Sequence, residues 1–172
     1  MGQIIRNQVV VEDDWATLDD AAPVPAVGKV IVSQARWLSE KATLKARGNV
    51  GLRIEPTLDA NQLADDLRYL SLIVIPFVFI KPKPEGGLTF DGRGYSQARL
   101  LRERFGFKGE IRATGGVFRD VIYYAHRCGV NEFELRAGQD ISDALNAFRD
   151  FTAPAYQAAA DGQQTIFARR RA

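Results

Sequence analysis

The sequence predicts a single α/β domain built on a mainly parallel sheet of about five βα units. Two observations carry this prediction. Short β-branched or apolar runs alternate with segments of roughly ten to fifteen residues whose apolar side chains recur at helical spacing. A parallel strand covered on both faces reads as a near-continuous apolar run, and residues 72–80 are of that kind. The pattern leaves open whether the sheet is an open one or a partial, barrel-like arc.

Residues 1–26 precede the alternating units. Residues 4–11 are predicted to form a small hairpin with its turn near Arg6 and Asn7. Residues 13–26 are acidic and then rich in Pro and Ala, which indicates a connector or loop.

The first two units follow from capping residues and spacing. Residues 29–32 are a β-branched strand, and Ser33 caps a helix that Gly48 ends. Residues 50–55 are the second strand, and Asp59 caps the next helix. One face of that helix is predicted to carry leucines at helical spacing: Leu63, Leu67 and Leu70.

The third and fourth units surround a loop of lysine, proline and glycine. Residues 72–80 are the third strand, and residues 81–87 are an exposed loop by composition. A helix begins at Gly94 or Tyr95 and ends near Gly106.

The chain then continues with two more strands and helices. Residues 110–114 are the fourth strand and residues 117–128 the fourth helix. Residues 131–135 form the fifth strand, and Asp140 starts a last helix that reaches about Thr152. The domain is therefore predicted to cover residues 1–152, followed by a C-terminal tail: residues 153–172.

Composition bounds the function. A chain of 172 residues with 46% apolar and 26% charged residues suits one globular domain. Its 23 basic and 21 acidic residues give a net charge of +2, too balanced for a dedicated nucleic-acid binder. One cysteine excludes an intrachain disulfide and fits a cytoplasmic protein. No apolar run is long enough to span a membrane as a helix.

No cofactor or metal is expected. The pair Gly92 and Gly94 lacks the third glycine of a dinucleotide fingerprint and the lysine of a P-loop. His126 and Cys128 are the chain's single histidine and single cysteine, too few for a zinc or iron–sulfur site.

Three predicted strands carry a charge at their centre: Arg53, Arg112 and Glu134. A buried charge is costly unless it is paired and hydrogen-bonded, so the three side chains are expected to share one face in a polar cluster. Edge strands with one solvated face explain the same pattern equally well.

A glycine-bearing loop between the apolar strand and the helix that follows it, residues 90–104, is the most informative stretch. Ligands of α/β proteins usually lie in such loops at the carboxyl ends of strands. Asp91 and Tyr95 are the candidate catalytic residues, although Asp91 also suits a supporting role that holds Arg93 or Arg112. On the alternative interpretation Ser96 is a helix cap and Arg99 belongs to a solvated helix face.

A second loop of this kind follows the fourth strand. Thr114 and Gly115 precede a helix whose first turn holds Arg119, an arrangement that suits an anion and equally a plain turn. Sulfite, sulfate, phosphate or a carboxylate is the natural ligand class. The candidate ligand-binding residues are Arg93, Gly94, Ser96, Arg99, Arg112, Thr114, Gly115 and Arg119.

The runs 91–104, 109–113, 119–120 and 127–129 together resemble the bacterial DUF934 family, over about residues 27–151. Members of this family carry the label of oxidoreductases involved in sulfite reduction. The resemblance implies a role near the assimilatory sulfite reductase and brings no established catalytic residues. The sequence departs from the family pattern in a longer loop at residues 81–88. It also has Thr114-Gly115-Gly116-Val117 where a Gly-Asp-Val-like sequence is expected.

Two functions remain open on this basis. The chain is an accessory protein or subunit of sulfite reduction that binds a small anion or docks on a reductase component, which carries the redox centre. Alternatively, it is a stand-alone enzyme acting on a small anionic metabolite, with Arg93, Arg112 and Arg119 holding the anion and Tyr95 or Asp91 handling protons. A homodimer whose partner completes the arc is a third expectation, because exposed sheet edges favour pairing.

Overall fold

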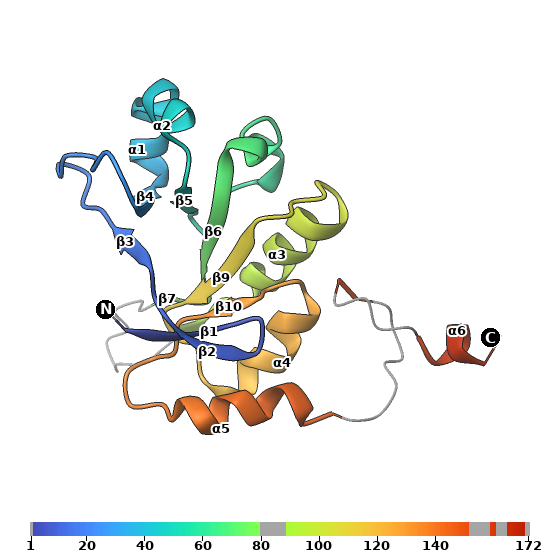
Figure 1. Cartoon of the computed structure of the whole chain (residues 1–172). Helices are drawn as coiled ribbons and strands as arrows, with labels where there is room; N and C mark the ends of the chain where they lie inside the picture. Colours follow the sequence, from blue (N-terminus) through green and yellow to red (C-terminus); the bar gives the residue numbers. More distant parts are fainter. Residues whose placement is uncertain (1, 80–88, 152–158, 161–164, 171–172) are drawn as a thin grey trace.

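The computed structural model describes residues 2–79, 89–151, 159–160 and 165–170 (Figure 1). The main sheet consists of β1 Gln3–Arg6, β2 Val9–Glu12, β3 Trp15–Thr17, β4 Lys29–Ser33, β5 Val50–Arg53, β6 Leu70–Pro76, β9 Glu110–Thr114 and β10 Glu132–Phe133. A small second sheet pairs β7 Val78–Phe79 with β8 Thr89–Phe90. The α-helices are α1 Gln34–Ser39, α2 Lys41–Arg47, α3 Arg93–Glu103, α4 Arg119–Arg127, α5 Ile141–Asn146 and α6 Ile166–Arg169. The 3₁₀ turns are η1 Ala60–Leu63, η2 Leu67–Tyr69 and η3 Ala147–Arg149.

The eight strands of the main sheet lie in the order β2-β1-β10-β9-β6-β5-β4-β3 and form an open, curled sheet (Figure 1). β1 pairs antiparallel with β2 and with β10, whereas the other neighbours pair parallel. The sheet is therefore mixed, and the prediction of a mainly parallel sheet of five units is wrong. Of the two shapes left open, the curled one is found.

Two N-terminal segments account for the difference between the predicted sheet and the observed one. The hairpin β1–β2 turns at Asn7 and Gln8, which both have positive φ (50° and 64°), and it extends the sheet beyond β10. Residues 15–17, predicted as part of a connector, instead form β3 and pair parallel with β4. Trp15 is only 8% exposed, and burial of its indole explains why so short a segment joins the sheet.

The curl follows from how the two edge strands are connected. β2 and β3 lie at opposite edges of the sheet, yet only Asp13 and Asp14 separate them in the chain. Three Cα–Cα steps from Glu12 to Trp15 span at most about 11 Å. The two edges must therefore approach each other, and Asp13 and Asp14 bridge the gap between them.

The two faces of the sheet are packed differently. One face forms the main core with the helices, as Ile73, Ile111, Trp37 and Leu101 illustrate. The inner, concave face holds a smaller buried cluster of Trp15, Ile31, Leu72 and Val74.

Gly51 lies within the concave face. A Cβ atom there would lie 3.1 Å from Cδ2 of Leu72 and 3.2 Å from Cγ1 of Ile31. A larger residue at position 51 would therefore require Leu72 or Ile31 to shift by a few tenths of an ångström.

Capping residues were predicted well, but helix lengths were not. Ser33 accepts a hydrogen bond from the amide of Arg36, and Asp140 accepts from Ser142, as N-caps do. The first predicted helix is broken at Glu40, which has φ −112° and ψ 22°, and Gly48 ends its second half.

The single helix predicted after Asp59 is wrong. Two 3₁₀ turns take its place, because Asp66 is drawn inward to Trp37 and Leu70 already begins β6. Leu63 and Leu67 are nevertheless buried, so the leucine spacing marked the core correctly. The predicted last helix is likewise split into α5 and η3. The loop predicted at residues 81–87 and most of the predicted tail lie outside the described residues.

Candidate functional site

Arg112 lies on the concave face of the sheet. Its neighbours Ile111 and Ala113 belong to the main core, so the alternation of a strand turns Arg112 to the opposite face. Its side chain is 1% exposed, and it donates to both carboxylate oxygens of Asp13, at 2.8 and 2.7 Å, and to Glu132 at 2.8 Å. Burial alone would lower the pKa of Arg112, but the hydrogen bonds and charges of Asp13 and Glu132 raise it. Arg112 is therefore held as a permanent cation inside the fold.

A second arginine and a lysine extend this network. Arg6 donates to Glu132 at 2.5 Å and to Asp14 at 2.8 Å, and Lys29 donates to Asp14 at 2.5 Å. Burial would raise the pKa of Asp14, but hydrogen bonds from Lys29 and Arg6 lower it to about 2. Asp13 and Asp14 thus anchor the bridge between the sheet edges at β9, β1 and β4. We call Asp13, Asp14, Glu132, Arg6, Arg112 and Lys29 the interior ion network.

Arg53, Arg112 and Glu134, which were predicted to form one polar cluster, do not pair with one another. The register of the strands places Arg53, Val74, Arg112 and Glu132 in one row across the concave face. Arg112 pairs with Glu132 in that row, and Glu134 instead accepts a hydrogen bond from Thr114 at 2.9 Å. Glu132, Asp13 and Asp14 were missed by sequence reasoning, because only the strand register and the edge-to-edge connection bring them to Arg112.

Asp91 and Arg93 form a local pair where α3 begins. Asp91 accepts from the backbone amide of Arg93 at 2.9 Å and from its guanidinium group. The hydrogen bond to Asp91 raises the pKa of Arg93. The prediction that Asp91 holds Arg93 is confirmed.

Gly94 is buried against the sheet. A Cβ atom at this position would lie 3.1 Å from Cε2 of Phe77 and 3.2 Å from Cγ2 of Ile75. Close packing of α3 against β6 and Phe77 accounts for the small residue at this position. A ligand is not needed to explain it.

Tyr95 is half-buried and packs edge-on against Phe77, with ring centroids 5.0 Å apart at 87°. Burial raises the pKa of the Tyr95 phenol to about 12. The phenol therefore stays protonated at neutral pH and can donate a proton or hydrogen bond, whereas it cannot serve there as a base.

This assignment can be tested by ultraviolet titration of the phenols. We expect the difference between the wild-type curve and that of Tyr95→Phe to show one ionisation near pH 12, well above the ordinary value of about 10. Tyr124, which is exposed, supplies the control through Tyr124→Phe. A difference curve for Tyr95→Phe centred near pH 10 would contradict the burial of this phenol in the folded chain.

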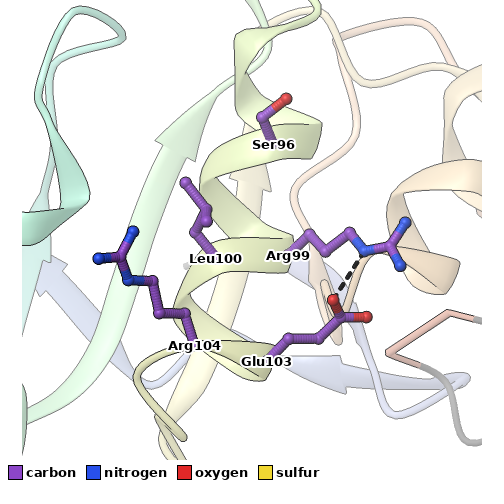
Figure 2. A pocket seen from close by; sticks show the side chains of 5 residues that line it. All are labelled: Ser96, Arg99, Leu100, Glu103 and Arg104. Atoms are coloured by element: carbon purple, nitrogen blue, oxygen red, sulfur yellow. Dashed lines mark hydrogen bonds and ion pairs between the residues drawn. The ribbon is translucent and has the colours of Figure 1, made fainter.

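Ser96 and Arg99 lie on the outward face of α3, where an open hollow of about 440 Å³ is lined by Ser96, Arg99, Leu100, Glu103 and Arg104. Figure 2 shows that Arg99 and Arg104 extend to opposite sides of the helix, with Leu100 between them. Arg99 also pairs with Glu103 at 2.9 Å, one helical turn away (Figure 2). Leu100 is 40% exposed, which gives this charged face an apolar centre. We call these five residues the α3 face.

The loop after β9 is a turn that leads into α4. Thr114 is buried, and its hydroxyl donates a hydrogen bond to Glu134. Gly115 has φ 89°, a backbone conformation that residues with side chains disfavour. Arg119, in the first turn of α4, forms ion pairs with Asp143 and with Asp150, the latter at 2.6 Å. Arg119 therefore links α4 to α5 and to the end of η3 through these ion pairs.

The three arginines expected to hold one anion do not converge. Arg112 lies on the concave face, Arg119 lies against α5 and η3, and Arg93 lies where α3 begins; each forms an ion pair with at least one carboxylate. Within the described residues, no group of three His, Cys, Asp or Glu side chains is placed to hold a metal ion. The α3 face is an open surface among the described residues.

No helix in the described part of the chain combines the length and apolar character that a membrane span requires. The search of curated proteins gave no match to this chain. The model of DUF934, described as a bacterial protein of unknown function, matches residues 51–167, which include β6, α3 and α4. The chain therefore belongs to the DUF934 family.

Proposed function

We propose that this protein is an accessory component of assimilatory sulfite reduction that docks on an acidic surface of a reductase component through its α3 face. The pathway comes from the label that the family resemblance carries. The docking mode rests on one observation. Arg93, Arg112 and Arg119 each form an ion pair with a carboxylate and do not converge on one anion, while Arg99, Leu100 and Arg104 line the open, outward face of α3, where Arg99 also pairs with Glu103.

The charge and chemistry of the chain support docking. The α3 face holds two arginines, Arg99 and Arg104, against one glutamate, so an acidic partner surface is the electrostatic complement. Exposed Leu100 supplies the apolar centre that stable interfaces contain. One cysteine and one histidine cannot ligate an iron–sulfur cluster, so the electrons of the reaction would pass through a group on the partner.

The experiment is affinity purification of the tagged protein from cells grown on sulfate, with crosslinking and identification of the captured proteins. We expect a sulfite reductase component among them. The double variant Arg99→Glu/Arg104→Glu should lose about tenfold or more of the captured reductase, because it reverses two charges on the α3 face. The complex should also weaken as salt is raised.

A matched control carries the same charge change elsewhere. Arg136 and Arg149 are exposed and lie outside α3, so Arg136→Glu/Arg149→Glu should capture the reductase as the wild type does. Equal loss in both double variants would show a general effect of net charge and would overturn the docking site. Absence of a reductase component from every crosslinked sample, together with normal growth of a deletion strain on sulfate, would overturn the function.

A further inference from the structure

A pocket that the proposed function does not use lies at the carboxyl ends of β3, β4 and β5. It measures about 290 Å³, and its lining includes Leu18, Asp19, Asp20, Ser33 and Arg53. The carboxyl ends of parallel strands are where α/β folds bind small molecules. The pocket is below the usual size for a drug-sized ligand, so it suits a small metabolite.

Arg53 supplies the pocket with an available cation. It is the last residue of β5, and the strand register places it opposite Ser33 on β4 and Val74 on β6. Its side chain is exposed, and among the described residues no carboxylate or carbonyl accepts a hydrogen bond from its guanidinium group. Arg36, by contrast, donates to two backbone carbonyls and to the carboxylate of Glu40. An arginine in this state is the side chain best suited to a carboxylate.

The carboxylate of Asp20 is held by Ser33, and Asp19 precedes it in the pocket lining. The hydroxyl of Ser33 donates to Asp20 at 2.6 Å. Buried Arg36 fixes the same turn by donating to the carbonyls of Asp19 at 2.7 Å and Ala22 at 2.6 Å. The pocket is therefore lined by a carboxylate that Ser33 holds, that of Asp20, and by the cation of Arg53, and the two are not paired with each other. Leu18 adds an apolar contact.

We propose that this pocket binds a small zwitterion of the amino-acid class, with the ligand carboxylate on Arg53 and its ammonium group on Asp20. A ligand of this class neutralises both sets of charges at once, which a simple anion or a simple amine does not. The proposal is independent of docking, because it concerns the carboxyl ends of β3 to β5 and leaves the α3 face unused.

The test is amide chemical-shift mapping by NMR with the full, isotope-labelled chain. L-Serine, L-valine and L-glutamate are the probes, each added up to about 20 mM. At least one should shift the amides of Leu18, Ser33 and Arg53 in a saturable way. For L-valine the half-ligands are 3-methylbutanoate, which lacks the ammonium group, and isobutylamine, which lacks the carboxylate. Each should bind about tenfold or more weakly than L-valine, because one charge contact is lost.

Two variants locate the contacts. Arg53→Gln and Asp20→Asn should each weaken binding about tenfold or more. Arg149→Gln, the same change at an exposed arginine outside the pocket, should leave binding unchanged. The wild-type-like spectrum of each variant verifies its fold. Shifts that map away from the pocket, unchanged binding in Arg53→Gln, or no shift with any of the three amino acids would overturn the proposal. None of these results depends on a reductase partner.

Discussion

Replacement of Arg112 by methionine is expected to lower the free energy of unfolding by about 3–5 kcal/mol. Methionine has a similar length but no charge, so the change leaves half-buried Asp13 without its cation and leaves buried Glu132 with Arg6 alone. The cost of an unpaired buried charge, rather than the strength of the ion pair itself, sets this magnitude. Urea unfolding at neutral pH measures it directly.

The control is an exposed arginine in an ion pair of similar length. Arg99 pairs with Glu103 at 2.9 Å on the surface of α3, so Arg99→Met should change stability by no more than about 0.5 kcal/mol. The double variant Arg112→Met/Glu132→Leu tests the pairing. It should lose about 1–3 kcal/mol less than the sum of its two single variants, because each single change already removes the ion pair that Arg112 and Glu132 share. A loss below about 1 kcal/mol for Arg112→Met would mean that solvent reaches the network and that the two carboxylates are not dehydrated.

The same network shows why part of the fold was beyond sequence reasoning. The apolar run that contains Leu72 and Ile75 and the caps Ser33 and Asp140 are local signals, and they predicted elements that the structure contains. Asp13 and Arg112 are separated by 99 positions, and no local pattern links them. Their contact depends on β2 and β3 lying at opposite edges of a curled sheet.

The prediction of short elements from the sequence failed for a related reason. β3 has three residues, too few for an alternation to be visible, and only the burial of Trp15 beside β4 makes it a strand. The leucine spacing after Asp59 indicated which side chains are buried but not the kind of helix, because successive 3₁₀ turns place Leu63 and Leu67 inward as well. In both segments the tertiary contacts, rather than the local sequence, determine which secondary structure forms.

At the candidate site, sequence reasoning found residues more readily than it found their roles. Asp91 and Arg93 are two positions apart, so their pairing was predictable from the chain. Arg119 drew attention as a cation at a helix start, but its partners Asp143 and Asp150 come from later segments. Counting arginines near glycines therefore overestimates the positive charge available to a ligand. Arg53, whose charge is not neutralised by an ion pair within the described residues, is the more informative arginine for small-molecule binding.

Replacement of Asp66 by asparagine is the second change that we expect to lower the free energy of unfolding strongly, and its effect depends on pH. Its side chain is buried, accepts from the indole of Trp37 at 3.0 Å, and forms ion pairs with Lys41 at 2.7 Å and Lys45 at 2.8 Å. Burial alone would raise the pKa of Asp66, but hydrogen bonds from Lys41, Lys45 and Trp37 lower it to about 2. Asp66→Asn keeps an oxygen for Trp37 and removes the charge. We expect the variant to lose about 2 kcal/mol of unfolding free energy at pH 7.

The sign of the pH dependence follows from the lowered pKa. The unfolded chain takes up a proton on Asp66 near pH 4, whereas the folded chain takes it up only near pH 2. The contribution of Asp66 to the free energy of unfolding is therefore complete above about pH 5. It is lost as the pH falls from about 4 to about 2. Unfolding curves of the wild type and Asp66→Asn should differ at pH 7 and converge toward pH 2. The neighbouring Asp65 is exposed, so Asp65→Asn should follow the wild type throughout. A difference for Asp66→Asn that stays constant from pH 7 to pH 2 would assign its cost to altered packing around Trp37, because a steric cost does not titrate.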